Sequence, residues 1–158
     1  MIETTAIVKE SSHFGNGYCR LKIEVEQLDV LPGQFAMLKP AGLEEPLLRR
    51  AMAFYTVETV NNKTLAEFIF HEIGRGTLAL GRLRRGESVY FLGPLGKSFS
   101  TEPAKQHSKA LIVGGGVGSP ALLMLAKQLQ GLSIQTEIFL GARSQQDLIG
   151  VEDFGSLG

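Results

Sequence analysis

Residues 1–101 alternate apolar and polar side chains with a period of two, the pattern typical of half-buried β-strands. The clearest run is residues 18–26, where Cys19, Leu21, Ile23 and Val25 alternate with Arg20, Lys22 and Glu24. Turn-forming residues interrupt the pattern about every ten positions, as in small antiparallel barrels and sandwiches. The predicted strands are residues 2–9, 18–26, 35–38, 51–60, 65–71 and 88–92. Residues 11–17 are rich in turn formers and predict a hairpin between the first two strands.

One short helix is expected among these strands. Gly74-Arg75-Gly76-Thr77 precedes apolar residues at helical spacing, and we expect Thr77 to be the N-cap because its hydroxyl can accept from a first-turn amide. Glycine allows close approach to the free N–H groups of a helix start, which bind anions. Two interpretations stay open from these residues alone: a site for a phosphate-bearing cofactor, or a capped helix that closes one end of a barrel.

The pattern changes after residue 101. Residues 110–113 are continuously apolar, which predicts a strand buried on both faces. A glycine-rich turn at 114–118, a helix at 121–130, a strand at 134–140 and a second helix at 145–154 follow. This is the start of a βαβ unit whose glycine-rich turn leads into a helix. Residues 102–158 are therefore expected to form a partial Rossmann-like nucleotide-binding unit, either part of a longer protein or naturally short.

Composition narrows the classes of function. The 16 basic and 16 acidic residues leave no net charge, which argues against a nucleic-acid binder held by bulk charge. No apolar run approaches the roughly 20 residues that span a bilayer, and no signal peptide is evident at the amino terminus, so we expect a cytoplasmic protein. The one cysteine, Cys19, rules out an internal disulfide and a four-thiolate iron–sulfur cluster in this chain.

Several candidate contacts have a structural alternative. Arg49-Arg50 either clamps a phosphate or is a solvated pair at a strand edge, and taken alone the pair favours the second. The glycine-rich turn either binds a dinucleotide or is a close helix–strand crossing. Arg143-Ser144 either holds a 2′-phosphate or is a solvated turn, which leaves NADH and NADPH open. Four aromatic strand residues either stack on a flat ring or, more commonly, fill the core: Phe54, Tyr55, Phe68 and Phe70.

Five motifs occur in order along the chain: LPGQF (31–35), LLRR (47–50), EIGRGT (72–77), GPLGKSF (93–99) and LIVGGGVGSPALLMLAKQL (111–129). Together they resemble the ferredoxin reductase-type flavoprotein family, and most nearly the electron-transfer subunits of bacterial dihydroorotate dehydrogenase. The resemblance implies a six-stranded antiparallel Greek-key barrel that binds FAD (1–101), followed by an NAD(P)-binding α/β domain (102–158). It also implies hydride transfer from NAD(P)H to FAD, and electron delivery to a partner such as a dihydroorotate dehydrogenase catalytic subunit of pyrimidine biosynthesis. An oligomer is compatible with this reading.

The resemblance also implies the cofactor contacts, position by position. Arg50 matches the arginine of an arginine–proline–x–serine flavin motif, and His71 stands where an arginine is usual on the strand beside the flavin. Gly76 and Thr77 match the pair that holds the pyrophosphate. The implied FAD contacts are Arg50, Ala51, Met52, Ala53, Ile69, Phe70, His71, Gly76 and Thr77. The implied contacts of the nicotinamide nucleotide are Gly114, Gly115, Gly116, Val117 and Gly118.

Two departures from the family pattern define an alternative. Ala51 and Ala53 stand where the motif has proline and serine, and the four cysteines that bind a two-iron–two-sulfur cluster in the subunits it resembles are absent. The alternative is a non-enzymatic barrel that has lost its cofactor and serves as a binding or scaffold subunit. A third reading keeps the fold and the flavin but delivers electrons to another acceptor.

Overall fold

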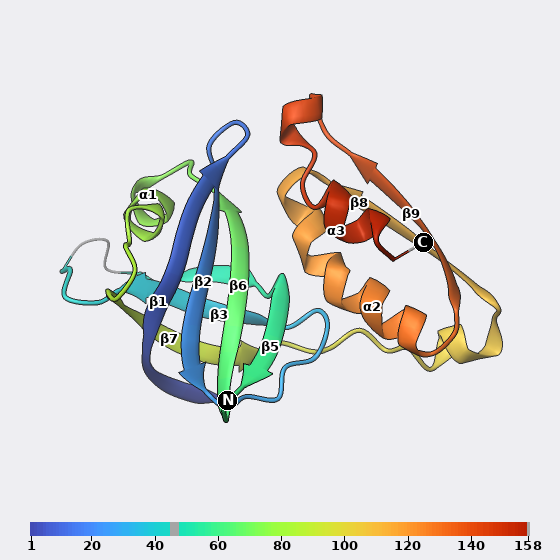
Figure 1. Cartoon of the computed structure of the whole chain (residues 1–158), viewed down its shortest axis with the longest axis horizontal. Helices are drawn as coiled ribbons and strands as arrows, with labels where there is room; N and C mark the ends of the chain where they lie inside the picture. Colours follow the sequence, from blue (N-terminus) through green and yellow to red (C-terminus); the bar gives the residue numbers. More distant parts are fainter. Residues whose placement is uncertain (45–47, 158) are drawn as a thin grey trace.

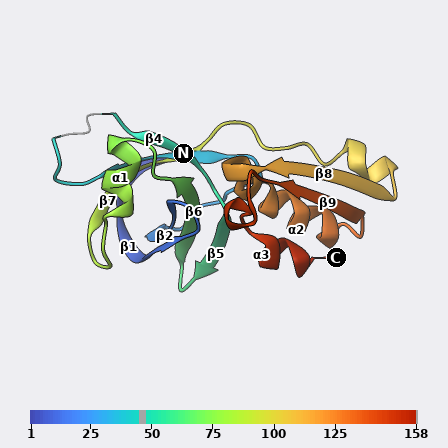
Figure 2. The ribbon, with the colours of Figure 1, turned by 90° about the horizontal axis from the view of Figure 1, so that it is seen from above.

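The computed structural model describes residues 1–44 and 48–157, so residues 45–47, which include the first leucine of LLRR, lie outside it. A seven-stranded antiparallel sheet with the order β4-β3-β7-β1-β2-β6-β5 curls into a half-barrel, and β8 and β9 form a separate parallel pair (Figures 1 and 2). The curled sheet consists of β1 (Ile2–Phe14), β2 (Tyr18–Glu26), β3 (Phe35–Pro40), β4 (Arg50–Ala53), β5 (Thr56–Val60), β6 (Lys63–His71) and β7 (Ser88–Leu95).

The predicted hairpin between the first two strands is confirmed. Phe14 pairs with Tyr18 across the turn, and Gly15 and Gly17 take φ of +52° and +79°, a conformation that glycine adopts without steric cost. The register shifts between Val8 and Glu10. Such a bulge bends a strand, and here it lies where β1 passes from its pairing with β7 (residues 2–7) to the rest of its pairing with β2 (residues 7–14).

The predicted strand 51–60 is wrong, because it is two strands. β4 pairs with β3, whereas β5 pairs with β6. Between them Phe54 is buried and the amide of Tyr55 donates to the carbonyl of Glu67 at 2.8 Å. This turn moves the chain from one edge of the sheet to the other, so the barrel has seven strands and not six.

The barrel core is aromatic at its centre. Phe54 lies between Phe68 and Phe91, with ring centroids 5.1 and 6.4 Å apart. The short helix α1 (Arg75–Gly81) buries Leu80 in the same core, and Leu83, just beyond the helix, is buried there too. α1 therefore covers one end of the barrel (Figure 1). The more common outcome predicted for the strand aromatics is confirmed, since Phe54, Tyr55, Phe68 and Phe70 are all buried.

The expected N-cap of α1 is wrong. The cap is Gly74 with extended backbone, and Thr77 is the third helical residue. The Thr77 hydroxyl still serves the helix start, because its oxygen accepts from the amides of Ile73 and Gly74, both at 3.1 Å. Thr77 thus forms one half of a capping box. Glycine, without a side chain, supplies no second half.

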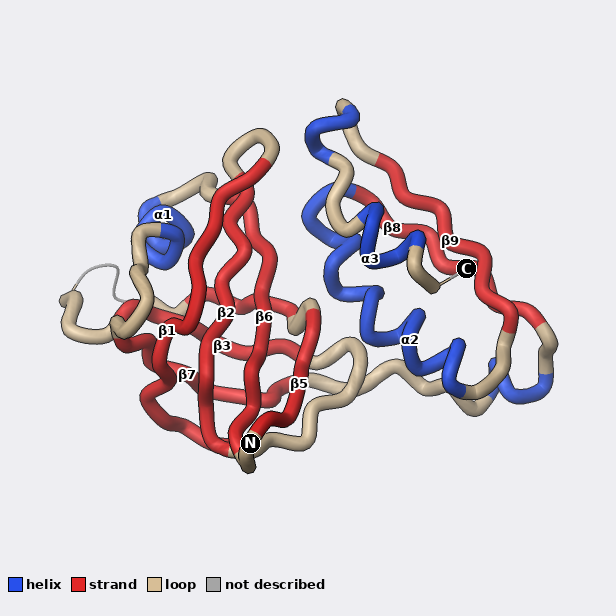
Figure 3. Tube along the Cα trace, viewed as in Figure 1, coloured by secondary structure: helices blue, strands red, loops and turns tan. Residues whose placement is uncertain are grey.

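The second unit has the predicted order of elements (Figure 3). After the short 3₁₀ helix η1 (Pro103–Gln106) come β8 (Lys109–Gly115), the 3₁₀ helix η2 (Gly116–Leu122), α2 (Leu123–Gly131), β9 (Gln135–Gly141), η3 (Gln145–Asp147) and α3 (Val151–Gly155). The predicted helix 121–130 begins as a 3₁₀ helix. The predicted helix 145–154 is interrupted at Gly150, which has φ of +76°.

The strand predicted at 110–113 is buried on one face only. Ile112 is 4% exposed and packs with α2, whereas Leu111 is 63% and Val113 69% exposed on the opposite face. α2 and α3 both lie on the Ile112 side of the parallel pair, and no described residue covers the other side. The boundary expected between residues 101 and 102 stays a prediction. Below, "barrel" means residues 1–101 and "α/β unit" means residues 102–157.

Candidate functional site

Arg50 and Gly76 meet at the end of the barrel that α1 covers. A Cβ built on Gly76 would lie 2.6 Å from Cζ of Arg50 and 2.7 Å from its Nη2. The guanidinium therefore lies directly on the backbone of the first helical turn, where only hydrogen fits. Two motifs that are far apart in the sequence are brought into one place, a cation beside the amide end of a helix.

Arg50 and Arg49 have different partners. Arg50 Nη1 donates to the carbonyl of Leu48 at 3.0 Å, which fixes one side of the guanidinium. Arg49 instead forms an ion pair with Glu3 at the amino end of β1. The interpretation of the pair as two solvated arginines is therefore incomplete, since Arg50 is half-buried over α1.

The other expected flavin contacts on β4 and β6 alternate between two environments. Met52 and Phe70 are buried in the barrel core, so their side chains lie among apolar residues. Ala51 is exposed and Ala53 half-buried on the other face of β4. Their small side chains leave the backbone of this edge strand accessible from outside the barrel.

Ile69 and His71 lie on the face of β6 that is turned toward the α/β unit. Ile69 is 8% exposed and packs with Tyr18, Tyr55 and residues of the α/β core. The half-buried ring of His71 stacks on Tyr18 with centroids 4.7 Å apart. η2 also contacts β6. The Ile69–His71 segment and the glycine-rich turn therefore lie on the same side of the molecule.

The glycine-rich turn ends β8 and begins η2. Gly114 is tightly packed, because a Cβ there would lie 3.0 Å from Oγ of Ser119 and 3.2 Å from its Cα. Gly116 has φ of +50°, and Val117 is half exposed at 50%. Gly115 and Gly118 have no atoms crowding a Cβ. The close helix–strand crossing is thus present, and it presents exposed backbone at the carboxyl end of β8, where open α/β sheets bind ligands.

Two polar contacts that the sequence did not predict join the two parts of the molecule. Asn16 of the β1–β2 turn donates from Nδ2 to Asp147 Oδ1 at 3.1 Å, and the hydroxyl of Tyr55 donates to Asp153 of α3. Donation from Ser144 Oγ, and then from Asn16, holds the pKa of Asp147 below its usual value. The spacing Ser144-x-x-Asp147 matches a capping box, so the contact between these two residues could have been predicted from the sequence. Nothing local marks Tyr55 and Asp153 as partners.

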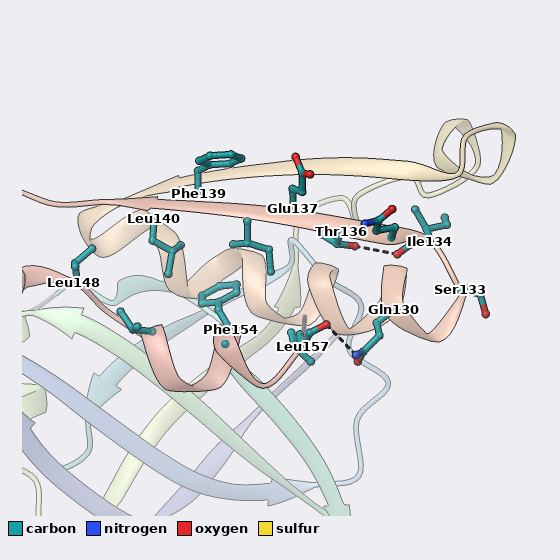
Figure 4. Close-up of a pocket in the computed structure, with 14 residues that line it drawn as sticks. Gln130, Ser133, Ile134, Thr136, Glu137, Phe139, Leu140, Leu148, Phe154 and Leu157 are labelled. Atoms are coloured by element: carbon teal, nitrogen blue, oxygen red, sulfur yellow. Dashed lines mark hydrogen bonds between the residues drawn. The ribbon is translucent and has the colours of Figure 1, made fainter.

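A groove of about 850 Å³ runs along the free edge of β9 (Figure 4). Leu140, Leu148 and Phe154 line it, while Phe139 and Glu137 point to the opposite side of the strand. None of the expected cofactor contacts lines the groove. Its position, along β9 and away from the glycine-rich turn, separates it from the candidate site.

The parts of the chain that the structure describes contain no helix long and apolar enough to cross a membrane. Within the same residues, no group of three or more His, Cys, Asp or Glu side chains is arranged to hold a metal ion.

Two curated relatives share more than a third of the aligned residues. The chain is 38% identical over 130 residues to the electron transfer subunit of dihydroorotate dehydrogenase B (NAD(+)) of Lysinibacillus sphaericus, which covers 82% of this chain and 50% of that protein. It is 36% identical over 127 residues to the Geobacillus kaustophilus subunit, and the match covers 80% of this chain and 49% of that subunit. The chain spans about half the length of the curated relatives that it matches. No protein-family model matches it.

Solved structures have the same fold. The cytochrome P450 reductase of Amycolatopsis superposes with a TM-score of 0.80 at 22% identity, over 99% of this chain and 48% of that one. Phthalate dioxygenase reductase, described as transferring electrons from pyridine nucleotides to [2Fe-2S], superposes with a TM-score of 0.76 at 12% identity. The superposition covers 96% of this chain and 47% of the reductase. Sequence and fold relatives thus confirm the resemblance drawn from the five motifs: the chain is similar to electron transfer subunits of dihydroorotate dehydrogenase, and it has the fold of the ferredoxin reductase-type flavoproteins.

Proposed function

We propose that this chain is the FAD-binding part of an electron-transfer subunit, which takes a hydride from NAD(P)H and passes electrons to a partner subunit. The observation that supports the proposal best is the contact of the Arg50 guanidinium with the backbone at Gly76. The FAD diphosphate carries two negative charges, and a half-buried cation beside free helix-start amides suits such a group.

The residues present fit the diphosphate. The Thr77 hydroxyl already accepts from the amides of Ile73 and Gly74. The next amides, those of Gly76 and Thr77, find no acceptor among the described residues. Guanidinium has five N–H donors, and Arg50 uses Nη1 on the carbonyls of Leu48 and Arg49. The donors on Nε and Nη2, on the side of α1, have no acceptor in residues 1–44 and 48–157.

The roles of the remaining residues follow from their environments. Ala53 on edge strand β4 and Ile69 on β6 border the flavin ring in this proposal, and the His71 imidazole adds a hydrogen-bonding group beside it. The residues Gly114–Gly118 hold the nicotinamide nucleotide at the carboxyl end of β8. When bound, the flavin supplies the two-electron chemistry, while the protein orients the two rings and excludes water.

The partner and the setting are proposed from the relatives. The curated relatives are named as electron transfer subunits of an NAD(+)-linked dihydroorotate dehydrogenase. A catalytic subunit of that kind in the cytoplasm is therefore the partner we propose for the whole protein. Residues 1–158 contain one cysteine, Cys19, and therefore hold no four-cysteine iron–sulfur site.

Titration of the purified protein with FAD, followed by visible absorption, tests the proposal. The charge-removing change Arg50→Gln should weaken FAD binding at least about tenfold, since hydrogen bonds to charged groups contribute about 1.5–3 kcal/mol. Arg49→Gln removes the same charge one residue away, from a guanidinium paired with Glu3, and should bind FAD as the unchanged protein does. Protein that stays colourless with FAD would refute the proposal.

The second candidate, a cofactor-free scaffold subunit, is favoured by Ala51 and Ala53, which lack the ring and hydroxyl of the family motif. It predicts no FAD binding by either variant or by the unchanged chain. It also predicts that NADH does not bleach added flavin.

A further inference from the structure

Tyr55 connects the strand that carries Arg50 to the α/β unit. It lies at the turn between β4 and β5 and is fully buried. Its amide is fixed by the carbonyl of Glu67 at 2.8 Å, so the barrel sets the position of its ring. The Tyr55 hydroxyl reaches out of the barrel and donates to Asp153 Oδ2 in α3.

The start of α3 is shaped around this hydroxyl. A Cβ on Gly150 would lie 3.0 Å from the Tyr55 oxygen, and Gly150 takes φ of +76°. A side chain there would be strained and would push against the tyrosine. Next to Gly150, Ile149 and Phe154 are buried in one apolar cluster with Tyr55 and Ile69. Polar and apolar contacts thus fix α3 on the same spot of the barrel.

Charged residues hold the Tyr55 ring from the other side. The guanidinium of Arg20 lies over the ring, 5.3 Å from its centroid. Arg20 donates to Glu67 at 2.8 Å, and Lys22 pairs with the other oxygen of the same carboxylate at 2.7 Å. Glu67, Arg20 and Lys22 alone carry a net charge of +1, and the carboxylate of Asp153 balances it. Asp153 of the α/β unit therefore places a negative charge beside this cationic group of the barrel.

We propose that Tyr55 is a positioning residue, which through Asp153 sets the α/β unit, and with it the Gly114–Gly118 turn, at a fixed distance from the flavin strand. This inference rests on the proposed function, because the distance matters only if a nicotinamide has to meet a flavin. α3 shares its core with Leu123 of α2 and Ile112 of β8. A shift of α3 against the barrel therefore moves the end of β8 as well.

The test compares Tyr55→Phe and Asp153→Asn with the unchanged, FAD-loaded protein. Both variants should keep their FAD content, because neither residue is among the expected FAD contacts. Anaerobic flavin reduction by NADH in a stopped-flow spectrometer should slow by about ten- to a hundredfold, the effect of misplacing reacting groups by about an ångström. The double variant should be no slower than either single variant, since both break one contact.

Hydrogen exchange of the same samples gives a readout independent of turnover. Peptides covering residues 148–157 should exchange faster in Tyr55→Phe, whereas peptides covering residues 2–12 of the barrel should not change. Tyr90→Phe, a tyrosine on β7 that is 39% exposed, is the matched control and should leave both readouts unchanged.

Three outcomes overturn the inference: unchanged exchange at 148–157, faster exchange with an unchanged rate of flavin reduction, or a loss of FAD as large as the loss of rate. Failure of the proposed function looks different. In that case the unchanged protein binds no FAD or is not reduced by NADH, and exchange alone then decides whether the Tyr55–Asp153 contact holds α3.

Discussion

The change Gly76→Ala tests the contact between Arg50 and α1 with a single methyl group. That methyl would lie 2.6 Å from Cζ of Arg50, so the guanidinium must move away. The guanidinium is the far end of a flexible side chain, and alanine is a better helix former than glycine by about 1 kcal/mol. We therefore expect the free energy of unfolding to change by less than about 1 kcal/mol.

FAD binding should respond much more strongly. Displacing the guanidinium removes hydrogen bonds from a cation to a phosphate, each of about 1.5–3 kcal/mol. One such bond corresponds to a dissociation constant about ten- to a hundredfold higher. The assay is FAD titration followed by absorption or flavin fluorescence, with urea unfolding of the same sample. Gly131→Ala in α2, where a Cβ meets nothing within 4 Å, is the control. Wild-type FAD affinity in a folded Gly76→Ala variant would show that Arg50 does not bind the cofactor.

Three further predictions follow from single residues. Ala53→Ser restores the hydroxyl of the family motif and should tighten FAD binding several-fold, because a net hydrogen bond contributes about 0.5–1.5 kcal/mol; unaltered affinity in the titration would place Ala53 away from the flavin. Gly114→Ala should separate η2 from β8 at Ser119 and raise the dissociation constant for NADH, while FAD content stays constant. The control in the NADH titration is Gly131→Ala, and equal NADH affinity of the two variants would contradict this prediction. Burial would raise the pKa of Glu67, but hydrogen bonds from Lys22, Arg20 and Thr56 outweigh it and lower the pKa. The Glu67 carboxylate therefore stabilises the fold above the unfolded-state pKa near 4.3, and this stabilisation is lost as pH falls through the lower folded-state pKa. In urea unfolding between pH 3 and 7, Glu67→Gln should lose less stability toward acid than the unchanged protein does.

Local pattern was sufficient for the elements whose causes are local. The alternation in residues 18–26 and the turn chemistry at Gly15 and Gly17 located the first hairpin, because period and positive φ are properties of neighbouring residues. The glycine-rich turn between β8 and α2 was predicted for the same reason. Proximity of Arg50 and Gly76 came from the family motifs and not from any pattern in the chain itself.

The errors arose where tertiary contacts decide. Phe54 and Tyr55 have the composition of a strand, yet the core and the carbonyl of Glu67 turn the chain there and divide one predicted strand into two. The apolar run at 110–113 resembles a strand buried on both faces, but helices cover only the Ile112 side. The contact of Tyr55 with Asp153 joins residues 98 positions apart, and no local signal links them.

The single cysteine gives this molecule a practical advantage. Cys19 is fully buried in β2, and burial raises the pKa of its thiol, so little reactive thiolate is present under native conditions. A pair of cysteines introduced on exposed positions of the barrel and of α2 would accept spin labels or fluorophores while the native thiol stays silent. The separation of the barrel and α2, with and without nucleotide, then becomes a directly measurable distance.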